Sequence, residues 1–136
     1  MKKTFLLTGM IACLAFGYAQ GSTKQGRTEN AGPNDPKVLA LLKAQQSQEA
    51  IKDCGDEHLG KVVFHNKTAK SVSLDLYASG GKGETINVTI PAGESVYVND
   101  LLVGEYKYKR INEKKPKKKD FVNVLECTLK VVLIDK

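Results

Sequence analysis

The sequence predicts an all-β protein, an antiparallel β-sandwich of about six or seven short strands, because two patterns recur along it. Apolar and polar residues alternate with a period of two, most clearly over residues 71–77 and 85–90, which is the pattern of a strand with one buried face. Turn-forming residues separate these runs at spacings typical of sandwiches. A signal peptide, a flexible linker and one short helix are expected to precede the sandwich.

The N-terminus has the composition of an export signal. Lys2 and Lys3 supply positive charge, an apolar stretch covers residues 5–16, and small residues end it at Ala19. We therefore expect residues 1–19 to be removed and the mature chain to be exported, to the periplasm, the cell surface or the medium. The apolar stretch is shorter than a membrane-spanning helix requires, so the mature chain is expected to have no transmembrane span.

Two alternatives for this leader stay open. Residues 10–13, Met-Ile-Ala-Cys, resemble a bacterial lipobox, in which Cys13 would become the lipidated first residue of the mature chain. Against this alternative, the apolar run continues past the cysteine through residues 14–16, where a lipoprotein usually has a polar linker. The other alternative is a signal anchor that is not cleaved.

Residues 20–34 are polar, rich in Gly, Ser, Thr and Asn, and show no apolar periodicity. This composition predicts a disordered linker. Asp35 and Pro36 then have the residue types of a helix N-cap and of a first helical position, and a weak apolar stripe follows. We expect a helix over residues 36–52 and a folded domain over residues 35–136.

The central part of the domain is predicted as a series of antiparallel strands. Strands are expected at residues 61–65 and 71–77, and residues 85–109 are expected to form a three-stranded meander. The sequence Pro-Ala-Gly-Glu at residues 91–94 supplies the first turn of the meander, since proline presets φ and glycine accepts a positive φ. A second turn is expected within residues 99–104, which begin with Asn-Asp and end with glycine.

Residues 121–135 are predicted to close the domain. Within it, Cys127 has the same parity as Leu129, Val131 and Leu133. Because alternate residues of a strand point to the same face, these four side chains are expected to face the core. An inward orientation of Cys127 favours a disulfide independently of the number of cysteines.

The cysteines predict one disulfide. If Cys13 leaves with the signal peptide, Cys54 and Cys127 remain as a pair in an oxidising compartment. The bridge would close a loop around almost the whole β region, and the chain-entropy model gives such a loop a stabilising effect of about 4 kcal/mol. The alternative, two free buried thiols, stays open.

Residues 90–98, IPAGESVYV, and residues 101–108, LLVGEYKY, are similar to a stretch of known modules. In immunoglobulin-like and prealbumin-like secreted β-sandwich modules, a Pro-Ala-Gly turn and a Gly-x-Tyr sequence at the start of a strand recur. The resemblance implies a sandwich fold and carries no catalytic positions that could be transferred to this chain. It also implies that Tyr106 forms a tyrosine corner, with its hydroxyl bonded back to the preceding turn. The chain has no tryptophan, so the core tryptophan of antibody domains is absent.

The densest chemical signal is a basic segment within a chain whose formal net charge is +6. Eight basic side chains occur within thirteen positions, and Glu113 is the only acidic residue among them. The eight candidate polyanion-binding residues are Lys107, Lys109, Arg110, Lys114, Lys115, Lys117, Lys118 and Lys119. At a hairpin tip they would present a positive field to lipopolysaccharide, an acidic glycan or nucleic acid. The alternative is a solvated loop that keeps the protein soluble, which the excess of lysine over arginine favours.

Catalytic and metal-binding patterns are absent from the sequence. Residues 53–58 combine three acidic side chains with one histidine, but their spacing fits neither an EF-hand loop nor a tetrahedral zinc site. His58 and His65 are the only histidines, and no Gly-x-Ser-x-Gly motif or glycine-rich phosphate loop occurs. We therefore expect no enzyme activity, no metal and no cofactor.

Three hypotheses about function follow from the sequence. The first is an exported, non-enzymatic module that binds another protein or an envelope component through its loops or an exposed sheet face. The second is a polyanion-binding protein that acts through residues 107–119. The third is an inhibitor of a secreted hydrolase, for which only the fold class gives support. Ionic strength separates the first two, since binding through exposed lysines weakens as salt is added.

Overall fold

The computed structural model describes residues 26–52, 54, 58–81 and 83–135. These residues form one helix and nine strands, whose bounds are as follows: β1 (Arg27–Gly32), α2 (Pro36–Lys43), β2 (Gln48–Ala50), β3 (Leu59–Asn66), β4 (Val72–Ala78), β5 (Ile86–Ile90), β6 (Ser95–Leu102), β7 (Gly104–Arg110), β8 (Phe121–Val124) and β9 (Thr128–Ile134).

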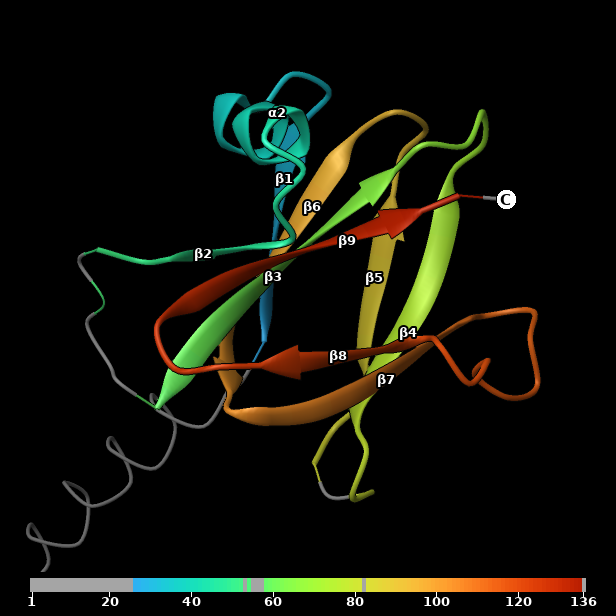
Figure 1. Cartoon of the computed structure of the whole chain (residues 1–136). Coiled ribbons are helices and arrows are strands. Elements are labelled where there is room, and N and C mark those ends of the chain that lie inside the picture. The colour runs from blue at the N-terminus through green and yellow to red at the C-terminus, as the bar shows by residue number, and fades with distance from the viewer. Residues whose placement is uncertain (1–25, 53, 55–57, 82, 136) are drawn as a thin grey trace, which may run out of the picture.

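The strands form two sheets that pack face to face (Figure 1). Sheet A has five strands in the order β1-β6-β3-β9-β2, and sheet B has four in the order β5-β4-β7-β8. Neighbouring strands are antiparallel, except that β3 and β9 are parallel. The prediction of an all-β sandwich is confirmed, with nine strands in the described part of the chain where six or seven were expected.

The main core lies between the inner faces of the two sheets. It is built from alternate residues of nearly every strand, as a half-buried strand requires. Phe64 of β3 and Leu76 of β4 are fully buried at its centre, one from each sheet. The buried members are Val62, Phe64, Val72, Leu74, Leu76, Val88, Ile90, Val96, Val98, Leu101, Tyr106, Val122, Val124 and Ile134.

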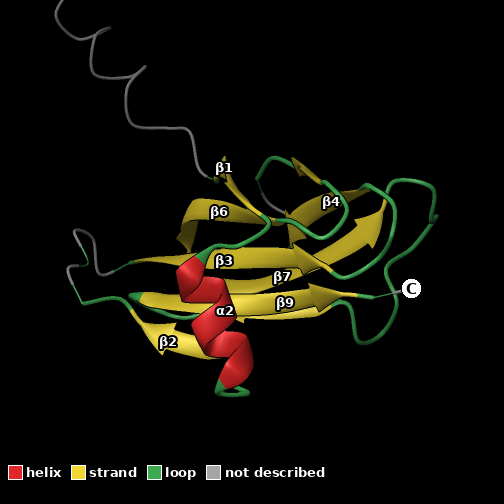
Figure 2. Ribbon diagram, turned by 90° about the horizontal axis from the view of Figure 1, so that it is seen from above, coloured by secondary structure: helices red, strands yellow, loops and turns green. Residues whose placement is uncertain are grey.

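A second, smaller core lies on the outer face of sheet A, where α2 crosses over β3 and β9 (Figure 2). Val38 and Leu41 of the helix are buried against Val63 of β3 and against Leu129 and Val131 of β9. Sheet A is therefore covered on both faces around β3. This explains why β3 contains a continuous apolar run in place of an alternating pattern.

The N-terminal strand corrects the linker prediction. β1 lies within residues 20–34, which were predicted to be a disordered linker, and it pairs with β6 along its length. Its side chains are polar and mostly exposed, so it carries no apolar alternation by which a strand could be detected. Arg27 bonds Asp100 at 3.1 Å and Glu29 bonds Asn99 at 3.1 Å. Residues 20–25, the predicted signal peptide and Cys13 lie outside the described residues.

The helix begins as predicted and ends earlier. Asp35 caps it, because its Oδ1 accepts hydrogen bonds from the backbone N–H groups of Lys37 and Val38, and the same oxygen accepts one from the Tyr97 hydroxyl of sheet A at 3.1 Å. The prediction of a helix over residues 36–52 is wrong beyond Lys43. The apolar stripe stops there, and the chain instead adds β2 to the edge of sheet A beside β9.

The predicted three-stranded meander over residues 85–109 is wrong in its pairing. β5 pairs with β4 in sheet B, β6 crosses to sheet A between β1 and β3, and β7 returns to sheet B between β4 and β8. The turn expected within residues 99–104 is present as the short connection at Val103 between β6 and β7, although Asp100 lies inside β6 with a φ of 56°. The register of β6 against β3 shifts at this point, which is the signature of a β-bulge.

The closing segment over residues 121–135 forms two strands, β8 in sheet B and β9 in sheet A. Leu129 and Val131 face α2 and not the main core, and Leu133 is 40% exposed. Cys127 lies in the connection between β8 and β9, with a φ of 47°. The disulfide between Cys54 and Cys127 is nevertheless present, with 5.6 Å between the Cα atoms. The pairing prediction is thus confirmed, but the parity argument for it does not hold.

Two buried polar groups join the strands to their turns. The Tyr106 hydroxyl donates to the Leu102 carbonyl at 2.9 Å, so the bond expected from this hydroxyl back to the preceding residues is present. Asn66, fully buried at the end of β3, donates from Nδ2 to the carbonyls of Lys70 and Ile90, and its Oδ1 accepts from Thr68. Asn66 thereby connects β3, the β3–β4 turn and β5 of the other sheet.

Replacing Asn66 with alanine should lower the free energy of unfolding by about 2 kcal/mol or more, because carbonyls and a turn N–H lose a buried partner. Urea titration measures the change. Asn112→Ala, at an exposed position, is the matched control and should have little effect. Equal unfolding free energies for the two variants would contradict the role assigned to Asn66.

Replacing Cys54 and Cys127 together with serine should lower the unfolding free energy by about 4 kcal/mol, because the bridge joins residues 73 positions apart and restricts the unfolded chain. Thermal unfolding with and without reductant provides the test. Reductant should shift the melting temperature of the wild type and leave that of the double variant unchanged. Mass spectrometry checks that the reductant has fully reduced the wild type. If the melting temperature is unchanged in that reduced protein, the result counts against the bridge.

Candidate functional site

The basic loop, defined here as residues 111–120, connects β7 to β8 and projects from one end of the sandwich (Figure 1). Its ends are tied to the sheet by backbone hydrogen bonds. The N–H of Ile111 donates to the Ser73 carbonyl at 3.1 Å, and the N–H of Tyr108 donates to the Asp120 carbonyl at 3.0 Å. Within the loop, the N–H of Asp120 donates to the Lys117 carbonyl at 3.0 Å. The loop is therefore a series of turns fixed to sheet B.

Glu113 organises the interior of the basic loop. Its carboxylate lies 3.5 Å from the Lys117 ammonium and accepts from the backbone N–H of Arg110. Its backbone carbonyl accepts from the Lys109 ammonium at 3.1 Å, and Lys109 is also 3.9 Å from the Asp75 carboxylate. Two of the eight predicted basic residues, Lys109 and Lys117, thus have part of their charge balanced within the protein.

A cavity of about 360 Å³, here named the basic cavity, lies between the basic loop, the end of β7 and the end of β9. Leu74, Tyr108 and Ile134 contribute apolar wall. Arg110, Lys117 and Lys119 bring positive charge to it, and Asp120 and Asp135 bring negative charge. The full lining is Leu74, Tyr108, Arg110, Lys117, Lys119, Asp120, Leu133, Ile134 and Asp135.

Tyr108 connects this cavity to the main core. Its ring meets the Phe64 ring edge to face, with 5.5 Å between the centroids, an arrangement that aromatic pairs favour. Burial, and then the charges of Asp120 and Asp135, raise the pKa of Tyr108 to about 12. The phenol therefore stays protonated at neutral pH and can donate a hydrogen bond to an acceptor in the cavity.

Arg110 is shared between the basic cavity and a second one. The second cavity has a volume of about 540 Å³ and lies between the β3–β4 turn and the start of the basic loop. Arg110 also donates to the Asp135 carbonyl at 3.4 Å, which holds the guanidinium near the chain end of β9. The residues that line the second cavity are Thr68, Ala69, Lys70, Ser71, Val72, Ser73, Arg110, Ile111 and Asn112.

The structure brings together three of the eight predicted basic residues. Arg110, Lys117 and Lys119 line one cavity, and Lys109 lies beside them in contact with Glu113. Lys114, Lys115 and Lys118 are exposed on the loop and line neither cavity. Lys107 lies apart from the loop, on the outer face of sheet B opposite Tyr77.

The wall residues Tyr108, Asp120 and Asp135 were not predicted as part of a site. Asp135 follows β9 and Tyr108 belongs to β7, so these residues meet only through the arrangement of the two sheets. The one local signal is the alternation of Tyr106 and Tyr108 with Lys107 and Lys109, which places both tyrosines on the same face of their strand. No spacing in the sequence relates that face to the C-terminal end of β9.

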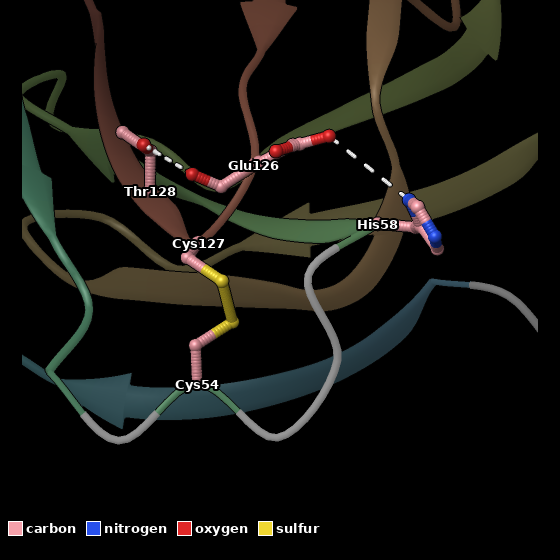
Figure 3. The surroundings of a disulfide bond; sticks show 5 residues. All are labelled: Cys54, His58, Glu126, Cys127 and Thr128. Carbon is pink, nitrogen blue, oxygen red and sulfur yellow. Dashed lines mark hydrogen bonds and ion pairs between the residues drawn. A yellow bond between two sulfur atoms is a disulfide. The ribbon is translucent and has the colours of Figure 1, made fainter.

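The surroundings of the disulfide form a second charged region (Figure 3). His58 lies 4.0 Å from the Glu126 carboxylate, with both side chains exposed, and Thr128 caps the turn by donating to the Glu126 carbonyl. Among the residues that the structure describes, no three His, Cys, Asp or Glu side chains are grouped as metal ligands would be. The acidic members of residues 53–58 lie outside the described residues.

A histidine and a serine meet in sheet A. Nδ1 of His65 lies 2.8 Å from the Ser95 hydroxyl, across the β3–β6 pair. Ser95 is only 1% exposed, so its hydroxyl is closed to a substrate and the contact holds the two strands together. Burial, and to a smaller extent the charge of Lys67, lowers the pKa of His65.

Comparison of the chain with protein-family models, with curated proteins and with solved structures finds no match. In the described part of the chain, no helix has the length and apolar character to cross a membrane. The chemistry of the basic loop and its cavity is therefore the basis for a proposal about function.

The lowered pKa of His65 predicts a loss of stability on mild acidification. Below the unfolded-state pKa of 6.5 the unfolded chain binds the proton more readily than the folded one, so the unfolding free energy falls as pH falls and levels off below the folded-state pKa. Above that range both states hold neutral histidine, and His65 contributes no pH dependence.

Thermal unfolding between about pH 7.5 and about pH 5.5 brackets this window. The melting temperature of the wild type should fall across it, and His65→Gln should remove most of the slope. The difference in melting temperature between the two proteins at the upper pH reflects the lost contact with Ser95. The prediction is therefore tested only by how steeply each melting temperature falls with pH. Parallel curves would show that His65 does not titrate as proposed.

Proposed function

We propose that the protein is an exported, non-enzymatic binding module whose ligand is an anionic polymer, held by the basic loop and the rim of the basic cavity. The observation that carries the proposal is the convergence of Arg110, Lys117 and Lys119 on one cavity, with Tyr108 as a neutral hydrogen-bond donor in its wall. A guanidinium held at the end of a sheet is suited to bind phosphate, sulfate or carboxylate groups with two parallel hydrogen bonds.

The lysines outside the cavity favour a polymer over a small anion. Lys114, Lys115 and Lys118 are exposed and lie outside the cavity lining. Lys119 belongs to the lining and is exposed as well. A polymer that places one anionic group at Arg110 can place further groups along these lysines. Each such contact releases a counterion, which adds affinity and makes binding strongly dependent on salt.

The carboxylates of the cavity limit where the anion binds. Asp120 and Asp135 lie in the lining and would repel an anion that entered deeply. The anionic group is therefore expected at the rim, near Lys119 and Arg110. The two carboxylates remain available to accept hydrogen bonds from hydroxyl groups of the ligand, and this combination suits an acidic glycan or the phosphorylated sugars of lipopolysaccharide.

The strand arrangement supports one of the two resemblances over the other. Counted from β3 to β9, the first, fourth and seventh strands lie in sheet A, and the second, third, fifth and sixth lie in sheet B. Constant-type immunoglobulin domains instead place the first, second, fourth and fifth strands in one sheet. Of the two classes that the sequence resembles, we therefore favour the prealbumin-like one.

Chromatography on immobilised heparin, a sulfated glycan, tests the proposal. In the loop variant, Lys114, Lys115, Lys118 and Lys119 are replaced by serine, and Lys117 is kept because it pairs with Glu113. The control variant has the same change at the exposed residues Lys37, Lys43, Lys52 and Lys67. The loop variant should bind heparin at least about tenfold more weakly than the control variant, with a shallower dependence on salt.

The two variants have the same net charge, so they distinguish a located site from general attraction. Equal elution of both variants would refute the proposal, as would a loop variant that elutes with the wild type. Arg110→Lys adds a further test, because it keeps the charge and removes the paired donors. If the cavity is the point of attachment, this variant should also bind more weakly.

A further inference from the structure

The outer face of sheet B carries a row of three side chains in direct register. Tyr77 of β4 lies opposite Lys107 of β7, and Lys107 lies opposite Phe121 of β8. Residues that oppose each other across an antiparallel pair share a face of the sheet. The row is thus an aromatic ring, a lysine and a second aromatic ring; Phe121 is 45% exposed, and Tyr77 is partly buried.

These aromatic residues differ from the two tyrosines of β7. Tyr106 and Tyr108 point inward and pack in the core, whereas Tyr77 and Phe121 have the outward parity. Strands lie about 4.8 Å apart, so two side chains on strands separated by a third stand roughly 10 Å apart. α2 covers the outer face of sheet A (Figure 2), while on sheet B the outward side chains of β7 and β8 are mostly exposed.

Polar groups border the row on both sides. On one side, Glu105 accepts from the Ser79 hydroxyl at 2.6 Å and lies opposite Asn123. On the other side, Asp75 accepts from the Asn87 amide at 3.0 Å and lies 3.9 Å from the Lys109 ammonium. These contacts fix an array of hydrogen-bond donors and acceptors around the two rings.

The charges of this face are balanced, unlike those of the basic loop. Its outward ionic side chains are Lys107 and Lys109 against Asp75 and Glu105. A nucleic acid stacked on the rings would bring its phosphates toward the two carboxylates. An uncharged ligand meets no such repulsion and can use the carboxylates, the amides and the ammonium groups as hydrogen-bond partners.

We propose that the outer face of sheet B binds a neutral polysaccharide. A pyranose ring has an apolar face of C–H groups that stacks on an aromatic ring, and hydroxyls at its edge that both donate and accept hydrogen bonds. Tyr77 and Phe121 offer two stacking positions along an extended chain, and Lys107 and the border residues Asn123 and Glu105 offer hydrogen-bond partners to its hydroxyls. This site does not rest on the basic loop and is separable from it.

Native gels cast with a soluble neutral polysaccharide test the proposal, using hydroxyethylcellulose, galactomannan and laminarin in separate gels. At least one polysaccharide should retard the wild-type protein, and added salt should leave the retardation unchanged. Phe121→Ala and Tyr77→Ala should each weaken it about tenfold, which is near the lower end of the range for losing an aromatic side chain that stacks on a nucleic-acid base. Asn123→Ala, an exposed border substitution, should weaken it less.

Two controls keep the test decisive. Leu39→Ala removes an apolar side chain of similar exposure, 38%, from the helix and should bind as the wild type does. The loop variant, which is predicted to lose heparin binding, should keep polysaccharide binding. Melting temperatures of all variants show that they are folded.

The proposal is overturned if none of the three polysaccharides retards the protein, or if retardation survives in both aromatic variants. It is also overturned if the loop variant loses retardation together with heparin binding, since the basic loop would then hold the glycan. Single-stranded DNA is used as a parallel probe, because nucleic acid is the other ligand considered for the outer face of sheet B. DNA binding that Phe121→Ala abolishes would assign this face to nucleic acid instead.

Discussion

The rest of the structure depends on β3 being paired on both edges and buried on both faces. β6 and β9 hydrogen-bond to its two edges, the main core covers one face, and α2 covers the other around Val63. A strand enclosed in this way can leave no backbone group unpaired. The last strand of the chain supplies the pairing at one of these edges by running parallel to β3, and this arrangement carries Asp135 to the basic loop.

The parts of the fold that could be predicted from the sequence are those that depend on local pattern. Apolar and polar residues alternate in β4 and β5 because each strand has one face in the core. Asp35 indicates the start of a helix because its side chain caps nearby N–H groups. The assignment of strands to sheets could not be predicted, since β5, β6 and β7 alternate alike but lie in different sheets. β1 could not be predicted because it pairs with β6 through its backbone and exposes polar side chains to water.

The same distinction applies to the sites. The basic segment is contiguous, so its charge is plain in the sequence, but its cavity is completed by Leu74 and Asp135 from distant strands. Tyr77 and Phe121 are separated by more than forty positions and become neighbours of Lys107 only through strand register. Cys127 shows a further limit, since a residue in a turn with positive φ does not follow strand parity.

The disulfide and the basic loop lie at opposite ends of β8, and this separation has a mechanical consequence. A pull on the N-terminal end of the described chain would act first on the backbone bonds between β1 and β6. If those bonds opened and α2 and β2 then detached from sheet A, extension would stop at Cys54, because the bridge to Cys127 encloses the chain between them. Force would then pass across the bridge to the turn beside β9 and would not extend the chain between the two cysteines. The basic loop lies within the segment that the bridge encloses, so a pull on the N-terminal end would not extend it.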